Sequence, residues 1–294
     1  MRSSILVVGA SGMLGAPVAR QLRADGWPVR VLTRSPERAR ARLGDGYELV
    51  TGDVERPVTL VKALQGCQGV HISLDGKADP DLERRGAEAV VQAAQKAGVE
   101  RITYLSGASV CEENCWYPGT KAKYDAERAL IGSGIAHTIF RAHYFMETLP
   151  NFVRGRLALV IGRHPHPYPW VAAEDYARMV ARAYAMPEAA NKILYICGPQ
   201  ALTMRQALGI FCRAAHPEAR LAPFPIPLAV IVARLGSRRD LQAALPFFRY
   251  CEQVRIILSG SPEEANCLLG APQTTLEEWS RHVAAQKAPA ALKH

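Results

Sequence analysis

Three glycines near the start of the chain have the spacing of a phosphate-binding turn. Gly9, Gly12 and Gly15 lie in the segment GASGMLG, after the apolar run Ile5–Val8 and before a helical pattern over Leu14–Arg23. Glycines in this order permit a sharp turn out of a strand, close approach of a pyrophosphate to the backbone, and tight packing of the following helix. The N-terminus of that helix attracts the phosphates. A tight turn without a ligand would have the same glycines, so the surrounding elements decide between the two.

Arginines are concentrated directly after the glycine segment. Between residues 20 and 42 the chain has seven arginines and two acidic residues. A fold that prefers NAD has a carboxylate for the ribose hydroxyls after the second strand, but here Thr33 is followed by Arg34, with Arg38 one helical turn later. A guanidinium binds a 2′-phosphate that a carboxylate would repel. We therefore expect NADP(H) as the cofactor; the alternative is that both arginines only solvate the start of a helix.

Strand-like and helical segments alternate through the first half of the chain. Strands are expected at 5–8, 29–33, 48–51, 70–74, 101–106 and 136–141, with helical segments between them. This rhythm predicts an α/β protein with a doubly wound parallel sheet (Rossmann) and a smaller, mainly helical C-terminal substrate lobe. We expect the NADP-binding domain over 1–150, with 171–198 returning to it. The substrate lobe is expected over 151–170 and 199–294.

The strand ends of such a sheet meet at one edge, where the cofactor is expected to lie. Ser11 adds a hydroxyl to the glycine turn, and Asp53, after the third strand, can accept a hydrogen bond from the adenine amino group. The residues expected at the cofactor are Gly9, Ser11, Gly12, Met13, Leu14, Gly15, Thr33, Arg34, Arg38, Asp53, Val54, Ser73, Leu74, Ser106 and Gly107.

Composition limits the classes of function. The chain has 294 residues, 49% hydrophobic and 21% charged, as expected of a globular protein with a sizeable core. Its net charge of +9 is concentrated near the glycine segment, and no helix-turn-helix, zinc-finger or aromatic RNA-binding signature is seen. We therefore expect a local anionic ligand and no nucleic acid. Seven cysteines fit no disulfide framework, and no metal site is expected from Cys111, Cys115, His164 and His166.

No secretory leader pattern and no apolar run of about 20 residues is seen. We therefore expect no membrane partner. The seven cysteines fit free thiols in a reducing, cytoplasmic environment, and the expected partner is a small-molecule substrate. A homodimer is compatible with the sequence.

These motifs resemble the atypical short-chain dehydrogenase/reductase superfamily, and specifically its NmrA-like NAD(P)-binding proteins. The resemblance extends from residue 1 to about 200, and more loosely to Trp279. It implies cofactor binding, and its motifs specify no substrate. The segments that carry it are Gly9–Gly15, Thr33-Arg34, Gly52–Val54, Tyr104–Ser109, Ser133–Arg141 and Tyr144–Glu147.

The resemblance implies two alternative positions for the catalytic residue. The wider superfamily uses a Tyr-x-x-x-Lys pair, in which the lysine lowers the pKa of a phenol that exchanges a proton. Tyr117 and Lys121 match that spacing, although Gly119 weakens the helix there. In a second register, Lys123 stands four residues before Glu127, a pattern common in NmrA-like sequences, and Lys123 contacts the nicotinamide ribose or moves the proton. The usual catalytic serine is offset, so a third alternative is that none of these residues is catalytic.

His143 and Tyr144 follow the sixth expected strand and have polar tips, so we expect them at the substrate; Phe145 and Met146 beside them fit a core role equally well. The resemblance implies an NADPH-dependent reductase that transfers hydride to a small, fairly apolar carbonyl, quinone, imine or activated alkene. The alternative is a non-catalytic NADP(H)-sensing regulatory protein of the NmrA type. A sugar-nucleotide epimerase is disfavoured by the lack of a sugar-diphosphate clamp.

Overall fold

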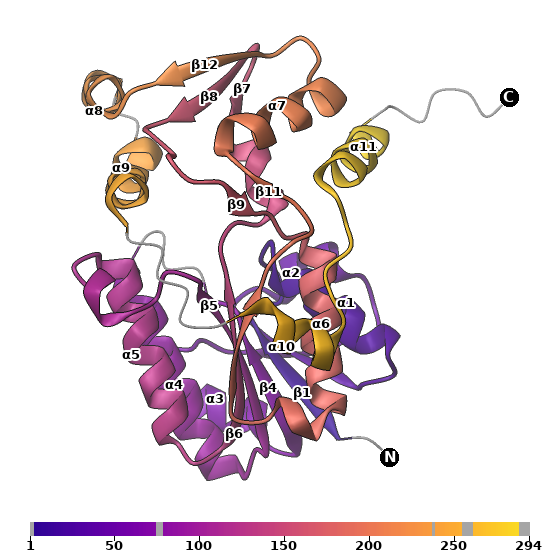
Figure 1. The fold of residues 1–294 in the computed structure, drawn as a ribbon. Coiled ribbons are helices and arrows are strands. Elements are labelled where there is room, and N and C mark those ends of the chain that lie inside the picture. The colour runs from indigo at the N-terminus through magenta and orange to yellow at the C-terminus, as the bar shows by residue number, and fades with distance from the viewer. Residues whose placement is uncertain (1–2, 75–78, 237–238, 255–260, 288–294) are drawn as a thin grey trace, which may run out of the picture. The chain divides into compact units, whose positions relative to one another are not determined.

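The chain forms two compact units. The computed structural model describes residues 3–74, 79–236, 239–254 and 261–287 (Figure 1). The first unit contains the described residues of Met1–Ala142, Ala173–Ile196 and Arg255–Ala271, and the second those of His143–Ala172, Cys197–Val254 and Pro272–His294. The ends of the expected domains, residues 1–2 and 288–294, lie outside the described residues.

A parallel sheet of seven strands forms the centre of the first unit. Its order is β10-β6-β5-β4-β1-β2-β3, and each neighbouring pair is parallel. The order reverses between β1 and β4, which creates the crevice where doubly wound sheets bind ligands. The predicted doubly wound fold is therefore confirmed. The strands are β1 (Ser4–Val8), β2 (Val29–Thr33), β3 (Glu48–Thr51), β4 (Cys67–Ile72), β5 (Arg101–Gly107), β6 (Ala136–Ala142) and β10 (Lys192–Ile196).

Helices cover both faces of this sheet (Figure 1). On one face α4 packs against α3 and α5, and on the other α1 packs against α2 and α6. Because both faces are covered, β1 inside the sheet is apolar over Ile5–Val8, and Ile5, Leu6 and Val7 are fully buried. The helices are α1 (Gly15–Ala24), α2 (Pro36–Leu43), α3 (Pro57–Leu64), α4 (Pro80–Ala97), α5 (Pro118–Gly132), α6 (Ala173–Ala185) and α10 (Pro262–Leu269), with short 3₁₀ turns η1 (Glu112–Asn114) and η3 (Pro187–Ala189).

The second unit combines helices with two small sheets. One sheet has the order β12-β8-β7 and the other pairs β11 with β9. The prediction of a mainly helical C-terminal lobe missed β12, which pairs in parallel with β8, about 60 residues earlier in the chain. Among the described residues no helix is both long and apolar enough to cross a membrane. The elements are η2 (Met146–Phe152), β7 (Val153–Arg154), β8 (Leu157–Ile161), β9 (Tyr168–Pro169), β11 (Ala201–Leu202), α7 (Met204–Ala215), β12 (Arg220–Phe224), α8 (Ile226–Leu235), α9 (Arg239–Gln253) and α11 (Leu276–Lys287).

The turn between β1 and α1 has room only for glycine at two positions. Gly9 has a φ of +86°, and a Cβ there would lie 2.0 Å from the carbonyl oxygen of Ser73 after β4. A Cβ at Gly15 would lie 2.2 Å from the carbonyl oxygen of Gly9. Both obstacles are backbone atoms, which cannot rotate away as a side chain can. The first strand, the first helix and the end of β4 therefore approach closely only because these side chains are absent.

We expect Gly15→Ala to lower the free energy of unfolding by about 1–3 kcal/mol, the usual cost of overpacking. The measurement is urea denaturation followed by circular dichroism. Gly132→Ala is the matched control, because a Cβ at Gly132 in α5 meets nothing within 4 Å. That control should not lower the free energy of unfolding, because nothing obstructs the added Cβ. Equal stability of Gly15→Ala and the unmodified chain would contradict the close approach of Gly15 to the Gly9 carbonyl.

Candidate functional site

The glycine turn leaves an uncapped helix end at the sheet crevice. The Gly12 N–H donates to the Gly9 carbonyl (2.9 Å), which closes the turn, while Ser11 and Gly12 are exposed. Leu14, at the N-cap of α1, provides no side-chain hydrogen bond, and the first turn of α1 has no acidic residue. Because the first N–H groups of a helix lack partners within it, this end suits an anion. The turn therefore fits a pyrophosphate.

Two arginines lie after β2. The Arg34 side chain is 81% exposed, and its Nη1 is 4.0 Å from Oδ2 of Asp53. An exposed pair at this distance is weak, so Arg34 is free to turn to an anionic ligand. Arg38 is also exposed, whereas the Thr33 hydroxyl is buried and bonded to Ser35, donating to its carbonyl at 3.0 Å. The guanidinium groups, and not the Thr33 hydroxyl, are therefore available to a phosphate.

The loops after β3 and β4 complete this edge of the sheet. The Ser73 N–H donates to the Val8 carbonyl (3.1 Å), which holds the end of β4 beside the end of β1. Gly86 of α4 lets two predicted cofactor residues come close: a Cβ at Gly86 would lie 2.6 Å from Leu74 Cδ1 and 3.2 Å from Val54 Cγ2. The fold thus brings together predicted residues from three separate loops.

Tyr117 and Lys121 do not form a helical pair in the structure. Tyr117 has extended backbone (φ −90°, ψ 123°) at the N-cap, ahead of α5 and not within it. Lys121 is exposed and binds Asp125, with Nζ 2.6 Å from Oδ1. This hydrogen bond raises the pKa of Lys121. The ammonium of Lys121 is therefore engaged along the outside of the helix.

Lys123 is held by a buried carboxylate at the end of β5. Its ammonium pairs with Oε1 of Glu83 from α4, a residue only 4% exposed. The same oxygen accepts a hydrogen bond from the Tyr104 hydroxyl at 2.8 Å. Burial, together with Glu83, raises the pKa of Tyr104 well above its usual value, so the phenol stays protonated as a donor. The Lys123 stem passes Gly107, where a Cβ would lie 3.6 Å from Lys123 Cδ. We call Glu83, Tyr104 and Lys123 the lysine cluster.

A second buried hydrogen-bond network lies next to the lysine cluster and is centred on Glu127. Ser106 donates to Glu127 Oε1 at 2.5 Å, and Arg141 Nε donates to the same oxygen at 2.9 Å. Arg141 also donates to the Tyr195 hydroxyl (2.8 Å). Glu127 therefore pairs with Arg141 and not with Lys123, and the Ser106 hydroxyl proton is engaged within the fold.

Sequence reasoning missed Glu83 as part of a site. Its signal was a charged residue on the apolar stripe of α4, in line with Ala87, Val90 and Ala94, which are buried. A carboxylate at such a position must find a partner, because burial of an unpaired charge is costly. Its partners, Tyr104 and Lys123, lie 21 and 40 residues away along the chain.

The two predicted substrate residues lie in an aromatic cluster of the second unit. The ring of Tyr144 lies 4.8 Å from Tyr168 and 5.1 Å from Trp170, and His143 lies 5.9 Å from Tyr168. Burial lowers the pKa of His143 to about 4, so its imidazole is neutral near pH 7. The Tyr168 hydroxyl is buried and has no hydrogen-bond partner among the residues that the structure describes. Phe145 and Met146 are buried, at 7% and 1% exposure.

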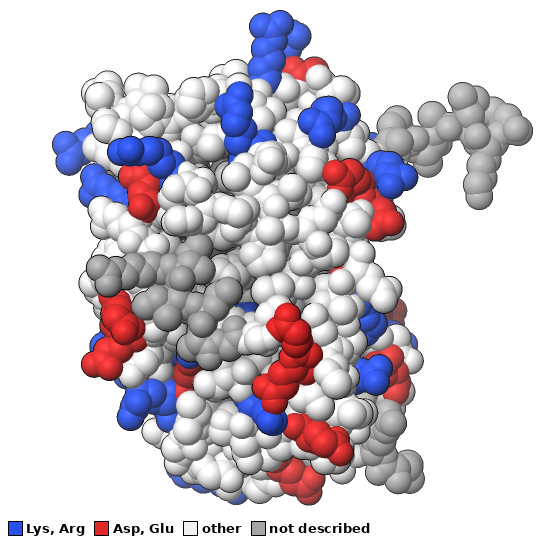
Figure 2. All heavy atoms as spheres, in the orientation of Figure 1, with Lys and Arg blue, Asp and Glu red and all other residues white. Residues whose placement is uncertain are grey.

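His164 and Cys115, two residues considered for a metal site, each bond to a nearby backbone carbonyl. His164 Nε2 bonds to the Ile161 carbonyl at 3.0 Å, and Cys115 Sγ bonds to the Cys111 carbonyl at 3.3 Å. Within the part of the chain that the structure describes, no group of three or more potential ligands could hold a metal ion. On the face shown in Figure 2, basic and acidic side chains are interspersed.

Known proteins with related sequences cover nearly the whole chain. A reductase of (4-alkanoyl-5-oxo-2,5-dihydrofuran-3-yl)methyl phosphate from Streptomyces griseus is 29% identical, over 97% of this chain and 99% of its own length. An NAD(P)H azoreductase from Xenophilus azovorans is 26% identical, over 96% and 98%. The photosystem II assembly factor Ycf39 of Trieres chinensis is also 26% identical, over 79% and 75%.

Solved structures show the same fold at lower identity. A triphenylmethane reductase from Citrobacter sp., crystallised with NADP(H), superposes with a TM-score of 0.75 at 20% identity, over 96% of this chain and 100% of that one. An NADPH-dependent quinone oxidoreductase from Escherichia coli, complexed with NADPH, gives 0.74 at 21% identity, over 95% and 99%. The profile of the NmrA-like family matches residues 1–279. The chain is therefore a member of the NmrA-like family, as its motifs predicted.

Proposed function

We propose that this protein is an NADPH-dependent reductase that acts on a small, fairly apolar carbonyl, quinone, imine or activated alkene. The observation that carries the proposal is the lysine cluster, which holds one ammonium group at the carboxyl edge of the sheet where the glycine turn also lies. Relatives named as reductases, including one named for NAD(P)H, support the same class of chemistry.

The cofactor would be held by the glycine turn and the arginines after β2. The uncapped start of α1 suits the pyrophosphate, and Arg34 with Arg38 suits a 2′-phosphate. Asp53 remains a candidate acceptor for the adenine amino group, with Oδ1 already accepting from the Glu55 N–H at 3.1 Å. When bound, NADPH supplies a hydride.

Lys123 would be the residue that handles the proton or orients a ribose hydroxyl. Its ammonium has three donors, and the contact with Glu83 uses one of them. Glu83 and Tyr104 would act as positioning residues, because they hold the ammonium while their own side chains are buried. Tyr117 is the weaker candidate, since it precedes α5 and Lys121 is engaged by Asp125.

The aromatic cluster of the second unit is the proposed substrate-binding surface. The partly exposed ring of Tyr144, which packs against the buried rings of Tyr168 and Trp170, favours a flat, apolar substrate. The partly exposed imidazole of His143, neutral near pH 7, would give such a substrate one polar contact without a charge. These features support an electrophile with a ring or conjugated system and one polar atom.

A non-catalytic NADP(H) sensor is the second candidate. The observation in its favour is the missing Tyr–Lys pair in α5, together with relatives named as assembly factors. The two candidates differ in one measurable property, the oxidation of bound NADPH. We expect oxidation, followed at 340 nm, with at least one acceptor in a panel of quinones, azo dyes and enones. Tight NADPH binding with no oxidation by any acceptor would favour the sensor.

Cofactor preference tests the role of Arg34. We expect tighter binding of NADPH than of NADH, and a loss in Arg34→Ala of about tenfold or more in NADPH affinity, since a charge-assisted hydrogen bond contributes about 1.5–3 kcal/mol. NADH affinity should not change. Calorimetric titration measures both, and Arg40→Ala is the control, because Arg40 is an exposed arginine nearby, in α2, that pairs with Asp45 at 3.6 Å. Equal affinities for NADH and NADPH in the unmodified chain would refute the assignment.

Single-turnover NADPH oxidation tests the lysine cluster. Lys123→Ala should slow the step by about 10²-fold, the lower range for a general acid, and Glu83→Gln should slow it less, because the lysine remains but is less well held. Lys121→Ala is the control and should keep the rate. Thermal melts distinguish a displaced Lys123 ammonium, which leaves the melting temperature unchanged, from a loss of folding, which lowers it. If the rate falls in Lys121→Ala or Tyr117→Phe and is unchanged in Lys123→Ala, the catalytic pair is Tyr117 and Lys121, and the proposal for Lys123 is wrong.

A further inference from the structure

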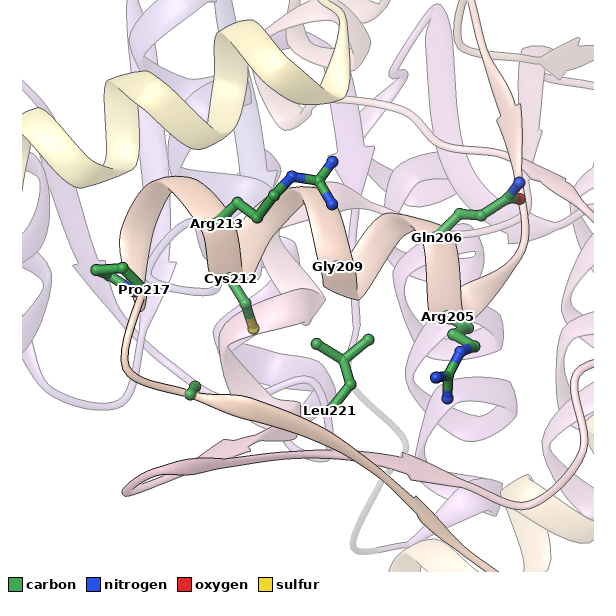
Figure 3. A pocket seen from close by; sticks show the side chains of 8 residues that line it. Arg205, Gln206, Gly209, Cys212, Arg213, Pro217 and Leu221 are labelled. Atoms are coloured by element: carbon green, nitrogen blue, oxygen red, sulfur yellow. The ribbon is translucent and has the colours of Figure 1, made fainter.

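We propose that the second unit contains a further ligand site, a hollow on α7 that binds an organic anion with an apolar body. The hollow has a volume of about 460 Å³ and lies between α7 and the segment that leads into β12 (Figure 3). Such a volume falls in the range of small-molecule sites, about 300–1,000 Å³. Its walls include Arg205, Gly209, Cys212, Arg213, Pro217 and Leu221.

Two arginines give the hollow its charge. Arg205 and Arg213 are exposed, and neither side chain has an ion-pair partner within the described ranges. They are eight residues apart on α7, which corresponds to about 12 Å along the helix axis. Glu218 is the one acidic residue between positions 205 and 221, and it pairs with His216 Nδ1 at 3.5 Å. The walls of the hollow therefore favour a negative charge.

Gly209 lies midway between these arginines and is not required by the fold. It is inside a helix, where glycine is less favourable than alanine. A Cβ at this position would meet only Arg213 Nη1 and Leu221 Cδ2, each at 3.7 Å, so an alanine would fit. Since neither packing nor backbone conformation explains the glycine, its effect is to keep this face of α7 open. A ligand can then lie against the helix between the two guanidinium groups.

Apart from the polar side chain of Gln206, the rest of the lining is apolar. Leu221 extends from β12 toward the helix (Figure 3), and Pro217 and Ala219 continue the same wall. Cys212 is 3% exposed, and burial raises the pKa of its thiol, so it contributes a neutral surface. A ligand that matches these walls combines a carboxylate, sulfonate or phosphate with a hydrophobic ring or chain. The site is separate from the aromatic cluster, which uses none of these residues.

The test is a fluorescence titration of the full chain with 8-anilinonaphthalene-1-sulfonate, in saturating NADP⁺ so that the cofactor site is filled. We expect saturable binding that weakens at least about tenfold in the double variant Arg205→Gln/Arg213→Gln, as for the loss of charge-assisted hydrogen bonds. The control is Arg128→Gln/Arg182→Gln, which removes two exposed arginines elsewhere. The uncharged N-phenyl-1-naphthylamine should bind more weakly than the sulfonate.

Two variants of Gly209 separate the site from folding. Gly209→Ala should raise the melting temperature, and Gly209→Leu, whose side chain fills the hollow, should abolish probe binding without lowering the melting temperature below that of the unmodified chain. Unchanged sulfonate affinity in Gly209→Leu or in the Arg205/Arg213 double variant would overturn the proposal. Equal affinity for the uncharged naphthylamine would overturn it as well.

Discussion

The contact between the ends of β1 and β4 is the constraint on which the cofactor edge depends. Gly9 lies against the Ser73 carbonyl, and Gly15 lies against the Gly9 carbonyl, at distances that no side chain could occupy. This contact forms where the strand order reverses, so it creates the crevice and aims the start of α1 into it. Because α1 begins without a capping side chain or a nearby carboxylate, its N–H groups remain available to an anion. The close backbone contact thus fixes the path of the chain, and the bare helix start gives the crevice its partial positive charge.

Buried ion pairs organise the neighbouring strands. Glu83 and Glu127 are 4% and 3% exposed, and each is held by a cation and a hydroxyl: Lys123 with Tyr104, and Arg141 with Ser106. Removal of one partner from such a pair leaves a buried charge, which usually costs more than the pair contributes. Each of these polar residues near the end of β5 therefore belongs to one of two separate networks. One fixes an arginine inside the sheet, and the other holds a lysine that is 27% exposed.

The fold was accessible from the sequence because its signals are local. Alternating apolar runs and helical segments predicted the parallel sheet. The boundaries of α4 show how local such signals are, because the helix starts at Pro80 after the cap Asp79 and ends before Gly98. The strand expected at 70–74 is Cys67–Ile72, shifted because pairing with β1 and β5 sets its limits. The pairing of β12 with β8 joins residues about 60 positions apart, so no local pattern predicted it.

The catalytic residue of α5 was harder to predict from the sequence, because the contacts that distinguish the two lysines are not all local. Lys121 and Lys123 are two residues apart and point in different directions around a helix, so spacing alone supports either one. Their partners separate them: Asp125 is one turn away, whereas Glu83 comes from another helix. The roles of these residues, and of the predicted cofactor residues, stay predictions.

The most direct test of the account is a crystal structure of the protein with NADP⁺. The account predicts that Lys123 Nζ, still paired with Glu83, lies within hydrogen-bond distance of the nicotinamide ribose, with Arg34 on the 2′-phosphate. A structure in which the Tyr117 hydroxyl contacts the nicotinamide ribose, while Lys123 remains remote from the cofactor, would contradict it.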